Sequence, residues 1–184
     1  MRIGKATVTL VIAIAAATAA YWYWSPHLAM RDMQNAAQRG DADALNAHID
    51  FPAVRESLRG QVAGMLAQKM GEAKDNPFAA LGTAIGMAFA DQMLQVFVRP
   101  ETIAASMRTG LWDPLGEAPA SRPAGGEEKL AWSYEREGAN KVIVRPHRKG
   151  EPADPQRPAY VLVRHGFADW KLSEIRIPLP LTHN

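Results

Sequence analysis

Four antiparallel strands are predicted by the sequences LAWSYEREGANKVIVRPH (residues 130–147) and AYVLVRHGFADWKLSEIRI (residues 159–177). Apolar and polar residues alternate in these sequences, as they do in strands with one face turned to a core. Glycine, asparagine and aspartate separate the alternating runs and are typical of turns. The expected strands begin at Leu130, Lys141, Tyr160 and Trp170, and together they form a meander within residues 129–178.

The last strand changes the face to which its apolar residues point. Trp170 and Leu172 share one parity, whereas Ile175 and Ile177 share the other. One extra residue in the strand restores a single apolar face, so a β-bulge is expected at residues 173–174. A bulge there would curl the sheet.

Helices are predicted upstream of this sheet, across residues 28–109. Their apolar residues recur every three or four positions, and Gly, Pro, Asp and Asn stand at the expected ends. The expected helices cover residues 28–39, 41–49, 52–70, 78–98 and 101–108, and a loop follows at residues 110–128. Helices followed by a curled antiparallel sheet of about four strands define an α+β domain, with the helices packed on one sheet face.

The predicted helix Phe78–Val98 leaves three interpretations open. Its only charged residue is Asp91, yet its large apolar residues gather on one stripe. It is interpreted as a buried core helix, because two glycines, one aspartate and two glutamines oppose membrane insertion. Contact with a membrane surface or a partner helix is the second interpretation, and a second membrane span is the third.

The first 24 residues are typical of a membrane anchor. Arg2 and Lys5 precede the uncharged run Ala6–Trp24, which corresponds to about 28 Å of helix and can cross a bilayer. Four aromatic residues end this run and are expected at the far membrane interface: Tyr21, Trp22, Tyr23 and Trp24. Residues 1–5 would then lie in the cytoplasm, and residues 6–24 would form the transmembrane anchor or uncleaved signal.

Two alternatives remain open for this segment: a cleaved signal peptide, cut at small residues within 17–20, and a buried helix of a soluble protein. Retention is favoured because an interface suits the aromatic side chains better than a free N-terminus does. Ser25-Pro26 is expected to end the helix, because proline cannot donate a backbone hydrogen bond. Residues 25–184 would follow as a single extracytoplasmic domain.

Composition narrows the function classes. Of the 184 residues, 21 are Lys or Arg and 19 are Asp or Glu, which gives a net charge of +2. Arg2 and Lys5 account for this surplus, so the domain after residue 24 is neutral and no nucleic-acid partner is expected. The absence of cysteine excludes thiolate metal sites, iron–sulfur clusters and a cysteine nucleophile.

No catalytic motif is found, and no catalytic residue, metal or cofactor is predicted. None of the 5 histidines has a partner at metal-ligand spacing. His147 and His165 lie on neighbouring predicted strands, but a register joining His147 to about Tyr160 would place His165 opposite about Val142. That separation is too large for a shared metal, so whether the chain is an enzyme stays open, with the balance against it.

The densest charged stretch is Arg145–Arg157, with four cations and two carboxylates. It is interpreted as a solvated hairpin, because no aromatic residues alternate with the cations as they would for nucleic acid. Binding of lipid phosphates or of an anionic envelope polymer is the alternative.

Four motifs carry a resemblance to a known family. They are the aromatic-Ser25-Pro26 junction, Gly40-Asp41 with Ala44-Leu45, Asp50-Phe51-Pro52 with Arg55-Glu56-Ser57-Leu58, and Trp170-Lys171-Leu172 with Ile177-Pro178-Leu179-Pro180. In these motifs the chain resembles a bacterial family of single-anchor envelope proteins that is catalogued as a domain of unknown function. The resemblance implies a single-pass protein of the bacterial inner membrane with its C-terminal domain in the periplasm. It supplies no activity, substrate or catalytic residue.

A looser resemblance concerns the fold. Short helices with a Gly-Asp hairpin, followed by a curled sheet ending in Trp-Lys-Leu, resemble the nuclear-transport-factor-2-like cones. That fold encloses a pocket in many of its members, although fold alone does not establish function. The nearly uncharged helix Phe78–Val98 departs from the pattern.

The leading functional hypothesis is a membrane-anchored envelope protein that acts as a non-catalytic binding or interaction module. Its membrane contact would be the N-terminal helix, and an envelope protein or a second copy would bind through the helices of residues 52–98. The alternative is an enzyme, or a binder of a small apolar ligand, with a cone-like pocket between helices and sheet. The pocket candidates are Trp132, Tyr134, Val161, Trp170 and Phe89. Candidate polar groups for an enzyme are His147, Asp91 and Tyr160.

A third hypothesis is a module that contacts the membrane surface. Four residues of the helical half would meet lipid in that case: Met65, Met70, Met87 and Phe89.

Overall fold

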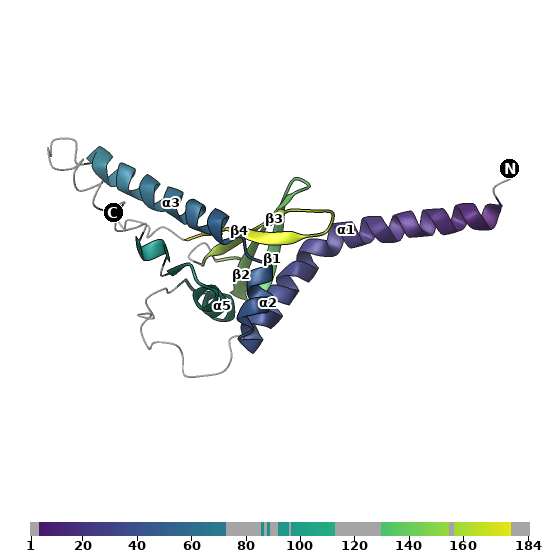
Figure 1. The fold of residues 1–184 in the computed structure, drawn as a ribbon, viewed down its shortest axis with the longest axis horizontal. Coiled ribbons are helices and arrows are strands. Elements are labelled where there is room, and N and C mark those ends of the chain that lie inside the picture. The colour runs from purple at the N-terminus through teal and green to yellow at the C-terminus, as the bar shows by residue number, and fades with distance from the viewer. Residues whose placement is uncertain are drawn as a thin grey trace.

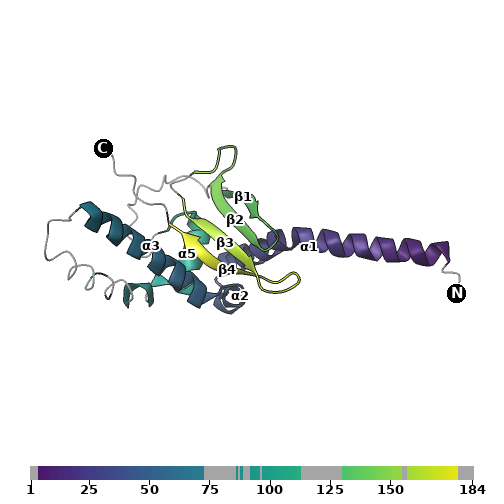
Figure 2. The same ribbon diagram turned by 90° about the horizontal axis from the view of Figure 1, so that it is seen from above.

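A computed structural model describes residues 4–72, 86, 88, 92–95, 97–112, 130–154 and 157–177. It contains a long N-terminal helix that runs from an exposed end into the body of the protein, where further helices lie beside a four-stranded antiparallel sheet (Figure 1). The α+β class predicted from the sequence is confirmed. The predicted curl of the sheet is mild, as the perpendicular view shows (Figure 2).

The helices begin and end at the residues that favour helix termini. The described helices are α1 (Lys5–Arg39), α2 (Ala42–Ala47), α3 (Phe51–Glu72) and α5 (Pro100–Thr109). Gly40 ends α1 with a φ of 68°, and the Asp41 carboxylate accepts a hydrogen bond from Ala44 N at 3.0 Å to cap α2. Asp50 caps α3 in the same way, through Ala53 N at 3.1 Å.

The strands are β1 (Leu130–Glu137), β2 (Lys141–Arg148), β3 (Ala159–Arg164) and β4 (Trp170–Arg176), in the spatial order β1-β2-β3-β4. The predicted meander is therefore confirmed. Val161 pairs with Glu174 and Leu162 pairs with Leu172, so Ser173 is the extra residue of a bulge. The bulge keeps Trp170, Leu172 and Ile175 buried.

The predicted register between β2 and β3 is wrong by three residues. Tyr160 pairs with Val144 rather than with His147, and Lys141 pairs with Val163. The end of β2 pairs only with β1, because the chain leaves β2 after Arg148 and starts β3 at Ala159. His147 and His165 remain at opposite ends of the sheet.

The main core lies between the helices and one face of the sheet. It joins residues of every described helix to residues of β2, β3 and β4, among them Met30, Met33, Leu45, Val54, Ile103, Val144, Tyr160, Leu162 and Leu172. A smaller cluster on the other face contains Ile143, Ala159 and Val161. Both faces of the central strands are therefore buried.

The free edge of β4 is covered by the chain between α2 and α3. Leu172 N donates to His48 O at 2.8 Å, and Asp50 N donates to Leu172 O at 2.9 Å. Farther along, Gln61 donates to Ile175 O at 2.8 Å and accepts from Ile177 N at 3.0 Å. These contacts satisfy backbone groups that an open edge would expose.

Three expectations concern residues outside the described part of the chain. The predicted helix Phe78–Val98 is described only in fragments, and within those fragments Gly86, Ala88 and residues 92–95 are helical. Phe89 and Asp91 lie outside the described residues. The predicted loop at 110–128 is described only to Trp112.

Candidate functional site

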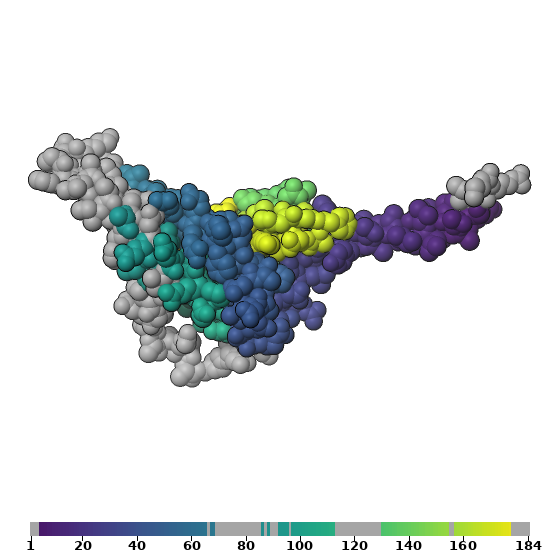
Figure 3. All heavy atoms as spheres, viewed as in Figure 1, coloured from purple at the N-terminus to yellow at the C-terminus, as the bar shows by residue number. Residues whose placement is uncertain are grey.

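Helix α1 consists of an exposed apolar half and a half that belongs to the core. The side chains of Leu10, Ile12 and Ile14 are 60%, 63% and 57% exposed, whereas Met30 and Met33 are fully buried. The exposed half projects from the body with no other described element against it (Figure 3). The helix is long and apolar enough to be a membrane anchor or a signal sequence.

The predicted helix break at Ser25-Pro26 is wrong. Helix α1 continues through Pro26, which has no N–H to donate to the carbonyl of Trp22. Ser25 replaces that donor, because its hydroxyl donates to Trp22 O at 2.8 Å. The same hydroxyl accepts from Trp170 Nε1 of β4 at 2.7 Å, and both partners are buried. Tertiary contacts therefore compensate for a proline that would otherwise interrupt the helix.

Arg164 stacks between two tryptophans where α1 meets the sheet. Its guanidinium carbon lies 4.1 Å from the ring centre of Trp22 and 4.3 Å from that of Trp170. Its Nε and Nη2 donate to the carbonyl of Ala139 at 3.3 and 3.2 Å, and its Nη1 donates to the carbonyl of Phe167. Each arginine–ring contact contributes about 0.5–2 kcal/mol, with the larger values at desolvated sites.

Arg136 makes a second contact of the same kind. Its Nη2 donates to Tyr23 O at 2.7 Å, and its guanidinium carbon lies 4.7 Å from the Tyr23 ring centre. Next to it, the His27 ring packs edge-on against Tyr134 with centroids 4.0 Å apart. Burial lowers the pKa of His27, and the positive charge of Arg136 lowers it further.

We refer to these contacts as the collar. Its members are Trp22, Tyr23, Trp24, Ser25 and His27 of α1, with Tyr134, Arg136, Arg164 and Trp170 of the sheet. The collar lies at the boundary between the exposed and the buried half of α1. It therefore holds the domain against the end of the apolar run.

The predicted membrane-interface residues divide into two groups. Tyr21, Tyr23 and Trp24 keep 54%, 52% and 57% of their surfaces exposed, while Trp22 is half-buried under Arg164. All four stand at the end of the exposed apolar helix, where an interface would lie. Their contact with a membrane stays a prediction.

The predicted pocket residues do not gather around one hollow. Trp132 and Trp170 belong to the main core, whereas Val161 belongs to the cluster on the opposite face of the sheet. Tyr134 takes part in the collar, and Phe89 lies outside the described residues. Of the polar candidates, Tyr160 is fully buried and its hydroxyl donates to Ser106 Oγ at 2.9 Å. His147 lies half-buried on β2, away from the collar.

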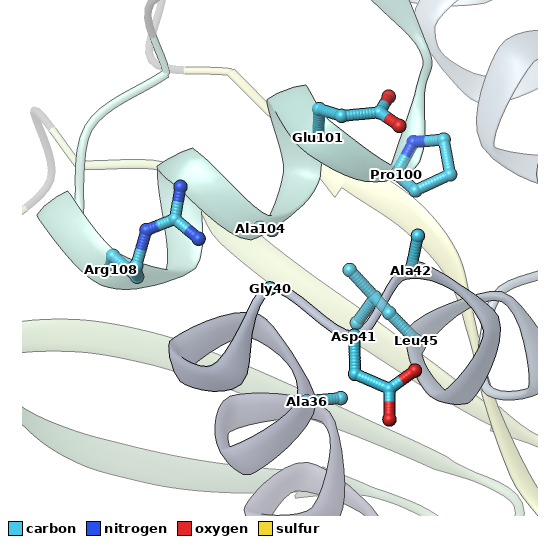
Figure 4. Close-up of a pocket in the computed structure, with 9 residues that line it drawn as sticks. All are labelled: Ala36, Gly40, Asp41, Ala42, Leu45, Pro100, Glu101, Ala104 and Arg108. Atoms are coloured by element: carbon cyan, nitrogen blue, oxygen red, sulfur yellow. The ribbon is translucent and has the colours of Figure 1, made fainter.

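A small hollow lies where α1, α2 and α5 meet (Figure 4). Its volume is about 170 Å³, and it is lined by Ala36, Gly40, Asp41, Ala42, Leu45, Pro100, Glu101, Ala104 and Arg108. Arg108 closes one side by donating to Ala37 O at 2.6 Å. Ligand pockets span about 300–1,000 Å³, so this hollow suits one side chain of a partner better than a whole small molecule.

Some cations of the stretch Arg145–Arg157 have carboxylate partners. Arg145 pairs with Glu135 at 2.7 Å, and Arg157 lies 3.6 Å from Asp154. Lys149 and Glu151 are exposed as the predicted solvated hairpin requires, but Arg157 is buried, so the prediction is wrong for that end of the stretch. Sequence reasoning missed Arg136 and Arg164, because no local pattern marks single arginines that meet an aromatic helix from two separate strands. Within the described ranges, no group of three or more potential ligands could hold a metal ion.

The fold and the collar define a class of protein: an α+β domain carried on one long apolar helix. The family model described as "Protein of unknown function (DUF2939)" matches residues 15–105. The match contains part of α1, all of α2 and α3 and part of α5, and it includes the Gly40-Asp41 and Asp50-Phe51-Pro52 motifs. The Trp170-Lys171-Leu172 motif lies outside it. No curated protein and no solved structure matches the chain.

Proposed function

We propose that the chain is a single-pass protein of the bacterial inner membrane, with a periplasmic domain that acts as a non-catalytic binding or interaction module. The observation that carries this proposal is the contrast along α1, where an exposed apolar half continues directly into a half that belongs to the core. An exposed apolar helix is costly in water and stable in a bilayer. Arg2 and Lys5 precede it and favour an N-terminus in the cytoplasm.

Retention of the helix is supported by the collar. A cut within residues 17–20 would fall inside a continuous helix and would leave Trp22 and Tyr23 next to a new, charged N-terminus. With the helix retained, the exposed rings of Tyr23 and Trp24 have an interface to occupy.

The interaction part of the proposal concerns the helices of residues 52–98. Val54 and Leu58, in the first two turns of α3, are buried on the sheet side. The part of α3 after Gln61 extends past β4, and Ala67 and Gln68 are exposed there (Figures 1 and 2). A projecting helix offers a face to an envelope protein or to a second copy of the chain.

The anchor is tested by cysteine labelling, which is specific for the introduced residue because the chain has no cysteine of its own. Ile3→Cys and Glu151→Cys variants of the full chain are expressed in bacteria, and spheroplasts are treated with an impermeant maleimide. We expect Glu151→Cys to be labelled in intact spheroplasts and Ile3→Cys only after lysis. Intact mass should include residues 1–24. A mature chain that lacks about 20 N-terminal residues, or one recovered in the soluble fraction, would overturn the anchor.

The interaction is tested by photo-crosslinking in cells. A photoreactive phenylalanine analogue replaces Gln68 on the projecting part of α3, and Asp43 on α2 serves as the exposed control. We expect a discrete crosslinked species from position 68 that is absent from position 43. Equal background at both positions would contradict a partner surface on α3.

A further inference from the structure

We propose that Arg136 and Arg164 bind the phosphate of an anionic lipid headgroup where α1 leaves the membrane. This inference rests on the proposed anchor, because it requires the collar to lie at the bilayer surface. The proposed ligand is a phosphate group that carries negative charge and that the bilayer holds at a fixed depth beside the helix.

The first observation is an excess of positive charge at the collar. Several other strand cations have carboxylate partners: Lys141 lies 2.8 Å from Glu137, and Arg145 lies 2.7 Å from Glu135. In the part of the chain that the structure describes, Arg136 and Arg164 form no such ion pair. They bond to backbone carbonyls instead, which supply no countercharge.

The second observation is that the two guanidinium groups contact neighbouring residues of α1, since Arg164 lies over the ring of Trp22 and Arg136 over the ring of Tyr23. Burial lowers the pKa of Arg164, and the charge of Arg136 contributes to the same shift. Both side chains point to the helix-covered face of the sheet, since Arg136 shares the parity of Trp132, and Arg164 that of Leu162. Two neighbouring cations repel each other, and an anion between them would remove that cost.

The third observation is an unused donor. Arg136 Nη1 is buried and has no hydrogen-bond partner among the described residues, while Nη2 of the same group is bonded to Tyr23 O. A buried donor without a partner is unfavourable, so an acceptor that reaches it would be favoured. Phosphate oxygens suit the planar fork of arginine in charge and in geometry.

The position of the collar selects a lipid phosphate rather than a free one. Tyr23, Trp24 and Phe167 are exposed on the collar or in the β3–β4 turn next to it, by 52%, 57% and 59%. Exposed aromatic residues at the end of an apolar helix are typical of the headgroup region. Arginines held at that level would meet lipid phosphates, and each basic residue near an anionic surface adds to the attraction.

The test measures lipid binding by the full chain in mild detergent. Native mass spectrometry follows titration with phosphatidylglycerol and, separately, with phosphatidylcholine. We expect the unmodified chain to prefer phosphatidylglycerol and Arg136→Gln/Arg164→Gln to lose about tenfold or more of that affinity. The matched control Arg145→Gln/Arg176→Gln removes two strand arginines that have carboxylate partners, and it should keep the preference.

Arg164 packs on two tryptophans, so its substitution also removes packing contacts. Variants at Arg136 alone therefore serve as the control for folding. Arg136→Lys keeps the charge and should retain most of the lipid preference, whereas Arg136→Gln should lose part of it while the near-ultraviolet circular dichroism stays unchanged. Inorganic phosphate is titrated separately. If it displaces phosphatidylglycerol at equal concentration, the site binds free phosphate and the lipid assignment is overturned.

The two proposals fail in different ways. A chain that remains membrane-embedded with residues 1–24, but whose lipid preference is the same in both double variants, refutes the lipid site and leaves the anchor intact. A mature chain without its apolar run refutes the anchor itself.

Discussion

Ser25→Ala should destabilise the domain far more than a serine-to-alanine change in a half-exposed strand. The Ser25 hydroxyl donates to Trp22 O at 2.8 Å and accepts from Trp170 Nε1 at 2.7 Å. The variant leaves both groups without these partners, and Trp170 is 1% exposed. At about 1–3 kcal/mol for each unsatisfied buried group, the expected loss is about 2–4 kcal/mol.

The measurement is urea unfolding of the full chain in mild detergent, followed by tryptophan fluorescence and near-ultraviolet circular dichroism. A loss of that size lowers the urea midpoint by about 1–2 M for a domain of this length. Ser133→Ala is the matched control, because its hydroxyl makes one long bond to Arg145 O at 3.3 Å. Its effect should stay within about 0.5 kcal/mol.

A second substitution separates the two lost hydrogen bonds. Pro26→Ala restores a backbone N–H that can donate to Trp22 O, so it should be more stabilising in the Ser25→Ala background than in the unmodified chain. The expected coupling is about 1 kcal/mol, the value of one hydrogen bond. Equal midpoints for Ser25→Ala and Ser133→Ala, or additive effects at positions 25 and 26, would refute the compensation at Pro26.

Three further changes test other parts of the structure. Gly110→Ala should destabilise the domain more than Gly138→Ala in the same urea titration: both have positive φ, but only at Gly110 would the new Cβ approach Arg157 Nη1, at 2.6 Å, and equal effects would contradict this packing. Gln61→Met should cost about 1–3 kcal/mol, because it leaves Ile175 O and Ile177 N without their side-chain partner, while Gln68→Met on the exposed part of α3 should change little. Unfolding free energy should fall as the pH drops below about 6.5, because the lowered pKa of His27 lets the unfolded chain bind that proton first. His27→Gln should reduce this dependence, and a variant with the same pH profile as the unmodified chain would contradict it.

Local signals predicted most of the fold. Gly40, Asp41, Asp50 and Gly110 end or cap their helices as expected, because each acts on backbone groups within four residues of itself. The bulge at Ser173 follows equally from parity within one strand. These features depend on interactions that a short window of sequence contains.

The predictions that were wrong concern features that depend on residues far apart in the sequence. Pro26 was expected to end the first helix, and it does not, because Ser25 is held by Trp170 from the far end of the chain. The β2–β3 register was wrong since the connection between these strands sets no fixed offset. Arg164 could not be identified as a site residue from the sequence either, because its role depends on contacts with Trp22 of α1 and Trp170 of β4, which only the fold brings together.

With the proposed anchor, a continuous α1 limits how the domain can move. A break at Ser25 would have left a hinge, and the domain could then rotate relative to the anchor. Instead, the collar fixes one turn of α1 to β1, β3 and β4 through Arg136, Arg164 and Trp170. Helix and sheet then behave as one body, so a tilt or rotation of the exposed apolar half of α1 would turn α3 and its exposed face by the same angle. Lipid phosphate bound at the arginines would fix the depth of that body, and the two proposals together describe a module presented at a constant height and orientation above the membrane.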